Sequence, residues 1–278
     1  MAKIDVRYIL TTIASFILAF IVGGIVMIVS DAEVASKFSY FFGRPMDAIS
    51  ASWDKVSSAY SALAIGAVGS WPAITESTAQ AAPLICAGLG VGLAFRAGLF
   101  NIGAQGQAIV GAILGAYVGF SFHGLPMVVH LTLGVVVGIV GGAVWGGIAG
   151  WLKAYTGAHE VIVTIMLNYI ASGMLAWLLT TTVFQRPGRT DPISQVVDWS
   201  ATMPRLEGTR LHLGFFLALL AAVAVWWLLD HTPLGFRIRA VGANPDASAT
   251  AGMSVPRTTV WTMVIAGALA GLAGIQYA

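Results

Sequence analysis

Long apolar segments alternate with polar connections along this chain of 278 residues. An α-helix needs about 20 apolar residues to cross the hydrocarbon core of a bilayer. The pattern therefore predicts an all-α polytopic membrane protein with about seven membrane segments. It predicts a single transmembrane domain over residues 1–278 and no soluble domain. The segments are Tyr8–Ser30, Ala81–Phe95, Gly103–Phe120, Met127–Gly150, Val161–Phe184, Leu213–Leu229 and Thr258–Ala278.

The first segment follows two basic residues, Lys3 and Arg7. A secretory signal peptide has an apolar stretch of only about 7–15 residues. The longer run here predicts an uncleaved membrane helix. The connection after it, Asp31–Gln80, is long enough to hold a short amphipathic helix around Ser50–Ala67.

Glycines recur at every fourth position in several segments, which places them on one face of a helix. Inside lipid, close backbone approach through small residues is a main source of packing energy. These faces therefore predict tight helix contacts rather than ligand sites. The glycines are Gly111, Gly115 and Gly119, then Gly134, Gly138, Gly142, Gly146 and Gly150, then Gly267 and Gly271.

Polar side chains and glycines interrupt the apolar stretch Ala82–Gln107. Unsatisfied polar groups cost several kcal/mol in lipid, so such a stretch lies against protein or lines a cavity. It is the first candidate for a translocation path, and its two segments are candidates for half-helices or a re-entrant pair. Asn101, Gln105 and Gln107 suit a polyhydroxyl or nucleobase ligand better than an ion. Alternatively, they satisfy backbone groups that the break leaves free.

A second polar position lies in the segment that begins at Glu160. Asn168 follows eight residues later, near the same helix face and about 12 Å along the axis. Asn168 faces the substrate, or it makes an inter-helix hydrogen bond while Glu160 caps the helix. Phe100 and Tyr169 flank these polar groups and could stack on a base.

The connection Asp230–Arg257 contains signals for a short helix. Asn244 is a good N-cap, Pro245 fits the first helical position, and Gly252 can end the helix in a left-handed conformation. We expect a helix over Pro245–Ala251 that docks into a groove on a soluble partner, or a surface helix with no partner. Its exposed small residues would be Ala247, Ser248, Ala249 and Thr250.

The composition agrees with a membrane protein. Charged residues are 9% of the chain, against about 25% in a soluble domain. The net charge of +2 is too small to indicate a nucleic-acid partner. The single cysteine, Cys86, excludes an internal disulfide, and the scattered histidines give no metal site.

Motifs for catalysis are missing from the sequence. A P-loop needs a lysine directly after a glycine, and none of the four lysines in this chain follows a glycine. His159-Glu160 begins like a zinc-protease motif, but Val163 stands where the second histidine belongs. We therefore expect a transport subunit that is not an enzyme and whose energy comes from another subunit or an ion gradient.

Three stretches together resemble the permease subunit of bacterial ABC importers for nucleosides and simple sugars, in the branched-chain amino acid/ribose permease superfamily. They are Pro83–Gln107, which ends in Phe-Asn-Ile-Gly-Ala-Gln-Gly-Gln, Glu160–Tyr169, and Gly235–Pro245. The resemblance implies a type II importer fold in the bacterial cytoplasmic membrane. It also implies a second permease subunit, identical or related, two ATPase subunits that bind the ATP, and an extracytoplasmic substrate-binding protein. No cofactor would be bound by this chain itself.

The resemblance makes the loop Gly235–Met253 a coupling segment that meets the ATPase on the cytoplasmic side, which places the N-terminus inside. Lysine and arginine counts alone do not decide the orientation. The coupling residues would be Arg237, Arg239, Gly242, Asn244, Pro245, Asp246, Ala247 and Ala249.

We expect alternating-access import of a nucleoside or related sugar. The path residues would be Phe100, Asn101, Gln105, Gln107, Asn168 and Tyr169. Many members of the family have glutamate where this chain has Gln105, and they continue beyond Ala278, so the chain resembles a C-terminally truncated permease. The alternatives are an ABC permease for a ribose-type sugar or branched-chain amino acid, a gradient-driven carrier coupled through a residue such as Glu160, and a scaffold without transport.

Overall fold

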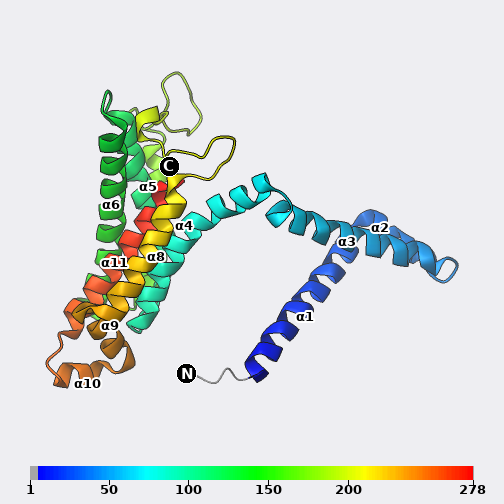
Figure 1. Ribbon diagram of the computed structural model, residues 1–278, viewed down its shortest axis with the longest axis horizontal. Helices are drawn as coiled ribbons and strands as arrows, with labels where there is room; N and C mark the ends of the chain where they lie inside the picture. Colours follow the sequence, from blue (N-terminus) through cyan, green and yellow to red (C-terminus); the bar gives the residue numbers. More distant parts are fainter. Residues whose placement is uncertain (1–5, 278) are drawn as a thin grey trace. The chain divides into compact units, whose positions relative to one another are not determined.

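A computed structural model describes residues 6–277 of the protein (Figure 1). Lys3 and Ala278 lie outside the described residues. Within the described range the regular structure is helical, and β-pairing is limited to two isolated bridges. The all-α prediction is confirmed. The chain forms two compact units, Met1–Ile74 and Thr75–Ala278, and its action as a single domain stays a prediction.

The first unit is built from two long helices and a short helical corner. Tyr60, on the second long helix, donates a hydrogen bond from its hydroxyl to the backbone oxygen of Phe20 at 2.6 Å. Near the corner, Lys55 Nζ lies 2.5 Å from Asp31 Oδ2. The predicted amphipathic helix Ser50–Ala67 is part of a longer one. The elements are α1 (Val6–Ser30), α2 (Ala32–Lys37), η1 (Phe38–Tyr40) and α3 (Pro45–Val68).

The second unit contains six long helices that run alternately up and down, with short helices at one end (Figure 1). Each of the seven predicted membrane segments falls on a helix. Six helices among the described residues are long and apolar enough to span a membrane: α1, α4, α6, α7, α8 and α11. From α4 onward the elements are α4 (Trp71–Arg96), α5 (Ala104–Ser121), α6 (Met127–Thr156), α7 (Glu160–Leu178), η2 (Trp199–Ala201), α8 (Leu213–His231), α9 (Pro233–Ala243), α10 (Pro245–Thr250) and α11 (Val255–Ile275).

The expectation that the segment Ala81–Phe95 is a half-helix is wrong, because this segment is part of the long continuous helix α4. It has 26 residues and begins ten residues before the apolar segment predicted at Ala81. At 1.5 Å per residue it is about 39 Å long, which exceeds the hydrocarbon core of a bilayer. The polar residues before Ala81 continue its hydrogen-bonded turns, so hydropathy alone placed its start too late.

Helices α5, α6 and α11 pack through glycine, as predicted. A Cβ added to Gly142 would collide with the backbone of α11, 2.6 Å from the Cα of Gly271. One added to Gly111 would also lie 2.6 Å from that Cα. Because these contacts are with backbone, the three helices approach as closely as their main chains allow.

The unit has two distinct ends (Figure 1). One, here called the α9–α10 end, holds those two short helices, the α4–α5 turn and the α6–α7 turn. The other, here called the loop end, holds residues 179–212 and the C-terminal end of α11.

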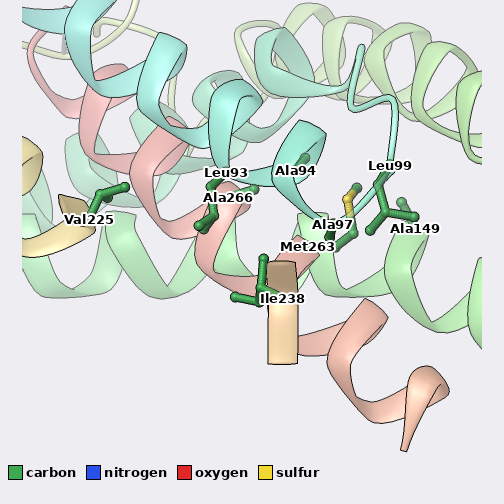
Figure 2. Close-up of a cluster of buried hydrophobic side chains, with 9 residues drawn as sticks. All are labelled: Leu93, Ala94, Ala97, Leu99, Ala149, Val225, Ile238, Met263 and Ala266. Carbon is green, nitrogen blue, oxygen red and sulfur yellow. The ribbon is translucent and has the colours of Figure 1, made fainter. Parts of the chain in front are cut away.

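Helix α9 is fastened to the bundle by a buried apolar cluster (Figure 2). Ile238 of α9 is fully buried among side chains from α4, α6, α8 and α11. Gly242 lies against the backbone at the end of α4, where an added Cβ would come 2.9 Å from the carbonyl carbon of Ala97. The cluster comprises Leu93, Ala94, Ala97, Leu99, Ala149, Val225, Ile238, Met263 and Ala266.

Candidate functional site

The turn between α4 and α5 carries the first candidate site. Asn101 and Gln107 are almost completely buried and form a reciprocal amide pair, with N···O distances of 3.2 and 3.1 Å. Asn101 Oδ1 also accepts a hydrogen bond from the backbone N–H of Gly103 at 3.0 Å. The pair thus satisfies its own polar groups and one backbone donor at the start of α5.

Asn168 of α7 joins this turn from the neighbouring helix. Its Oδ1 accepts from the backbone N–H of Gly106 at 2.8 Å, and its Nδ2 donates to the carbonyl of Ile102 at 3.0 Å. Gly106 is needed for this contact, because an added Cβ would lie 2.8 Å from Asn168 Oδ1. The inter-helix hydrogen bond that the sequence predicted as one alternative for Asn168 is therefore present, and Asn168 makes a second bond to the α4–α5 turn.

The other predicted path residues lie at the surface of the unit. Phe100 and Tyr169 are 52% and 73% exposed, and Gln105 is exposed as well. Phe100 packs edge-to-face on Phe95 with ring centroids 4.9 Å apart. The structure therefore joins Asn101, Gln107 and Asn168 to the α4–α5 turn by hydrogen bonds and leaves Phe100, Gln105 and Tyr169 exposed. The path role of all six residues stays a prediction.

Glu160 has a partner that sequence reasoning missed. Its carboxylate lies 2.8 Å from Lys153 Nζ, which comes from the last turns of α6. Thr164, buried one turn after Glu160, donates its hydroxyl to the Glu160 carbonyl at 2.8 Å. The ion pair closes the short α6–α7 turn. The sequence contained a signal for this ion pair, because Lys153 and Glu160 both lie in the short connection between the apolar segments Met127–Gly150 and Val161–Phe184.

The second candidate site is α10, which forms where the capping signals place it. Asn244 Oδ1 accepts a hydrogen bond from the Ala247 backbone N–H at 3.0 Å, and Gly252 has a φ of +82°. Ala247, Ala249 and Thr250 are exposed. Ser248 is not: it is buried, and its hydroxyl bonds back to the Asn244 carbonyl at 2.8 Å.

Helix α9 supplies a rigid base for α10. Arg239 is exposed and lies 3.3 Å from Asp230 at the end of α8, while Arg237 is exposed beside it. Gly242 is held against the α4–α5 turn, which also carries the buried amide pair. The C-terminal end of α9, from which α10 follows, is therefore in backbone contact with the end of α4, just before the turn that carries Asn101.

Comparison with known proteins finds matches that include both candidate sites. The family described as the branched-chain amino acid transport system permease component matches residues 73–278. The guanosine ABC transporter permease protein NupP of Bacillus subtilis is 42% identical over 223 residues, 79% of this chain and 63% of that protein. The nucleoside permease protein NupB of Lactococcus lactis is 35% identical over 78% of this chain, and the glucose permease protein TsgB13 of Haloferax volcanii is 32% identical over 78%.

The chain spans less than two thirds of the length of these relatives, between 60% and 63%. No solved structure matches it. The match nevertheless covers the helical bundle from residue 73 in α4 to the end of α11, including both candidate sites. The resemblance drawn from the sequence is confirmed: the chain belongs to the permease component family of branched-chain amino acid transport systems.

Proposed function

We propose that this protein is the membrane permease subunit of an ATP-driven importer for nucleosides or related simple sugars, in the bacterial cytoplasmic membrane. The observation that carries the proposal is the 42% identity to a protein named as a guanosine ABC transporter permease, across most of this chain. The glucose permease at 32% identity keeps sugars within the cargo class.

The partners follow from this function. ATPase subunits would bind the ATP, a second permease subunit would complete the membrane part, and an extracytoplasmic binding protein would deliver cargo. Helix α10 would meet the ATPase, because it projects exposed small residues from a firmly packed base. The α9–α10 end would then be cytoplasmic and the loop end extracytoplasmic.

The path would run past the exposed side chains of Phe100, Gln105 and Tyr169. These side chains have exposed polar or aromatic groups that a nucleoside could contact. The buried pair Asn101–Gln107 and the clamp from Asn168 would hold the turn in shape behind them. Movement of α9 would displace this turn, since Gly242 lies directly against it.

Uptake of labelled inosine by cells that carry the intact locus tests the function. We expect uptake that stops when cellular ATP is depleted and persists when the ion gradient is collapsed. Unlabelled nucleosides should compete, and amino acids should not. Uptake that survives ATP loss but follows the ion gradient would replace the proposal with a secondary carrier.

Replacing Tyr169 with leucine tests the path. Stacking of a base on an aromatic ring is worth about 1–3 kcal/mol, so uptake should fall roughly tenfold. The thermal stability of the protein should not change, since the ring is largely exposed. Trp226→Leu, which also replaces an exposed aromatic residue by leucine, on α8, is the control: Trp226 is 57% exposed and Tyr169 73%. Equal uptake by both variants would remove Tyr169 from the path.

A further inference from the structure

A polar cavity of about 340 Å³ opens at the loop end, far along the bundle from the sites described above. It lies within the second unit, between the N-terminal half of α4, the residues that follow α11 and the hairpin that leads into α8. Its volume falls within the range of small-molecule sites, about 300–1,000 Å³. Its polar lining residues are Glu76, Gln80, Arg205, Arg210, His212 and Gln276, with Tyr277 at its edge.

Charge in this cavity is only partly balanced. Glu76 Oε1 lies 3.4 Å from Arg210 and accepts a hydrogen bond from Gln80 at 3.2 Å. Arg205 is exposed and has no ion pair among the described residues. One guanidinium is therefore left to bind a ligand. A guanidinium suits the paired acceptors on the edge of a purine base, while carboxylate and amide groups suit sugar hydroxyls.

Gln276, which lines the cavity, also carries a side-chain acceptor without a partner among the described residues. Its Nε2 lies 3.5 Å from the sulfur of Cys86, but its buried Oε1 has no hydrogen-bond partner within the described chain. A buried polar atom without a partner costs about 1–3 kcal/mol, so a donor from a ligand or water would be favoured there. Gln276 and His212 converge over the start of α8, where an added Cβ on Gly214 would approach both side chains within 3.0 Å.

His212 is held neutral at this position. Burial and the neighbouring Arg205 lower the pKa of His212, and its Nδ1 accepts a hydrogen bond from the Gly214 backbone N–H at 3.1 Å. Nε2 of the neutral ring then carries the proton and is a donor. The site therefore offers donors and acceptors from four separate segments. A second, smaller cavity of about 90 Å³, lined in part by α5 and α6, shares Arg205, His212 and Gln276 with it.

We propose that this cavity is an entry-side binding site that receives the nucleoside before it crosses the bundle. The proposal rests on the function proposed above for its cargo class and for the extracytoplasmic position of the loop end. Arg205 and Gln276 recognise the base, Glu76 and Gln80 bind the sugar hydroxyls, and Tyr277 stacks on the ring. A ligand of this chemistry uses the free guanidinium and the unused amide oxygen together.

Cysteine protection tests the site in cells with the intact locus. The chain's single cysteine, Cys86, is buried, which gives a low background for modification. Arg210→Cys places a thiol in the cavity at a lining residue that is assigned no ligand contact, and Thr190→Cys places one on the exposed hairpin of the same end. We expect millimolar inosine to slow modification of the first by a membrane-impermeant methanethiosulfonate at least fivefold, with no effect on the second.

The outcomes separate this site from the proposed function. An unprotected cavity thiol in cells that take up inosine would overturn the site and leave the function standing. Absence of inosine uptake in cells with the intact locus would overturn the function itself. Protection by inorganic phosphate or a nucleotide but not by inosine would overturn the nucleoside assignment. Protection by excess binding protein without nucleoside, at both thiols, would make this surface a protein contact and also overturn the site.

Discussion

Gly142→Ala is expected to break the central packing of the bundle. The added methyl would press on the backbone of Gly271, 2.6 Å from its Cα, and a backbone cannot rotate away as a side chain can. Overpacking typically costs about 1–3 kcal/mol, and separation of α6 from α11 would also expose the other glycine contacts. Thermal unfolding of the purified protein in detergent should show a clear loss of stability.

Gly88→Ala is the matched control on α4. This glycine is exposed, and an added Cβ would meet nothing within 4 Å. Alanine favours a helix interior over glycine by up to about 1 kcal/mol, so this variant should be as stable as the parent or more so. Equal loss of stability in both variants would show that glycine content, rather than the α6–α11 contact, governs stability.

Ala249→Arg is expected to abolish uptake while leaving the permease folded. Ala249 is exposed on α10, so the arginine meets no packed neighbour in this chain. In the proposed complex, its length and charge would keep the helix out of a groove that admits small side chains. Labelled-nucleoside uptake and co-purification of the ATPase subunit measure the effect, and both should fall to background.

Thr190→Arg adds the same side chain at the loop end, where Thr190 is also exposed. It should leave association of the ATPase unchanged, which controls for added charge. Normal uptake and retained ATPase binding in Ala249→Arg would refute the docking role of α10. Loss of the permease from the membrane would instead point to a folding role, and the thermal stability of the purified variant distinguishes the two.

The helices could be predicted from local pattern, and their limits only in part. The short helix α10 was predicted to within one residue, because Asn244 and Pro245 act on the backbone next to them. The start of α4 was placed ten residues late, because hydropathy marks the apolar part of a helix and not its hydrogen-bonded end. Ser248 was expected at the surface, but its hydroxyl bonds back to Asn244.

The candidate sites show a similar division. The sequence identified Asn101, Gln107 and Asn168 as polar groups that need partners inside an apolar region. It could not pair the amides with each other or aim Asn168 at the backbone of α5, because these contacts depend on how α5 and α7 pack. Lys153 and the loop-end cavity were missed, since their partners come from separate helices.

By itself, the sequence determined that this chain is an all-helical membrane protein, which helix faces carry glycine, and where a short capped helix interrupts the spans. These features depend on neighbours within a few turns, where periodicity, capping and hydropathy act. Only the tertiary structure decided that Gly142 meets α11, that Ile238 fastens α9, and that Glu76, Arg205 and Gln276 share one cavity. Residues that far apart in the chain meet only when whole helices pack, and the packing is set by the fit of all contacting side chains together.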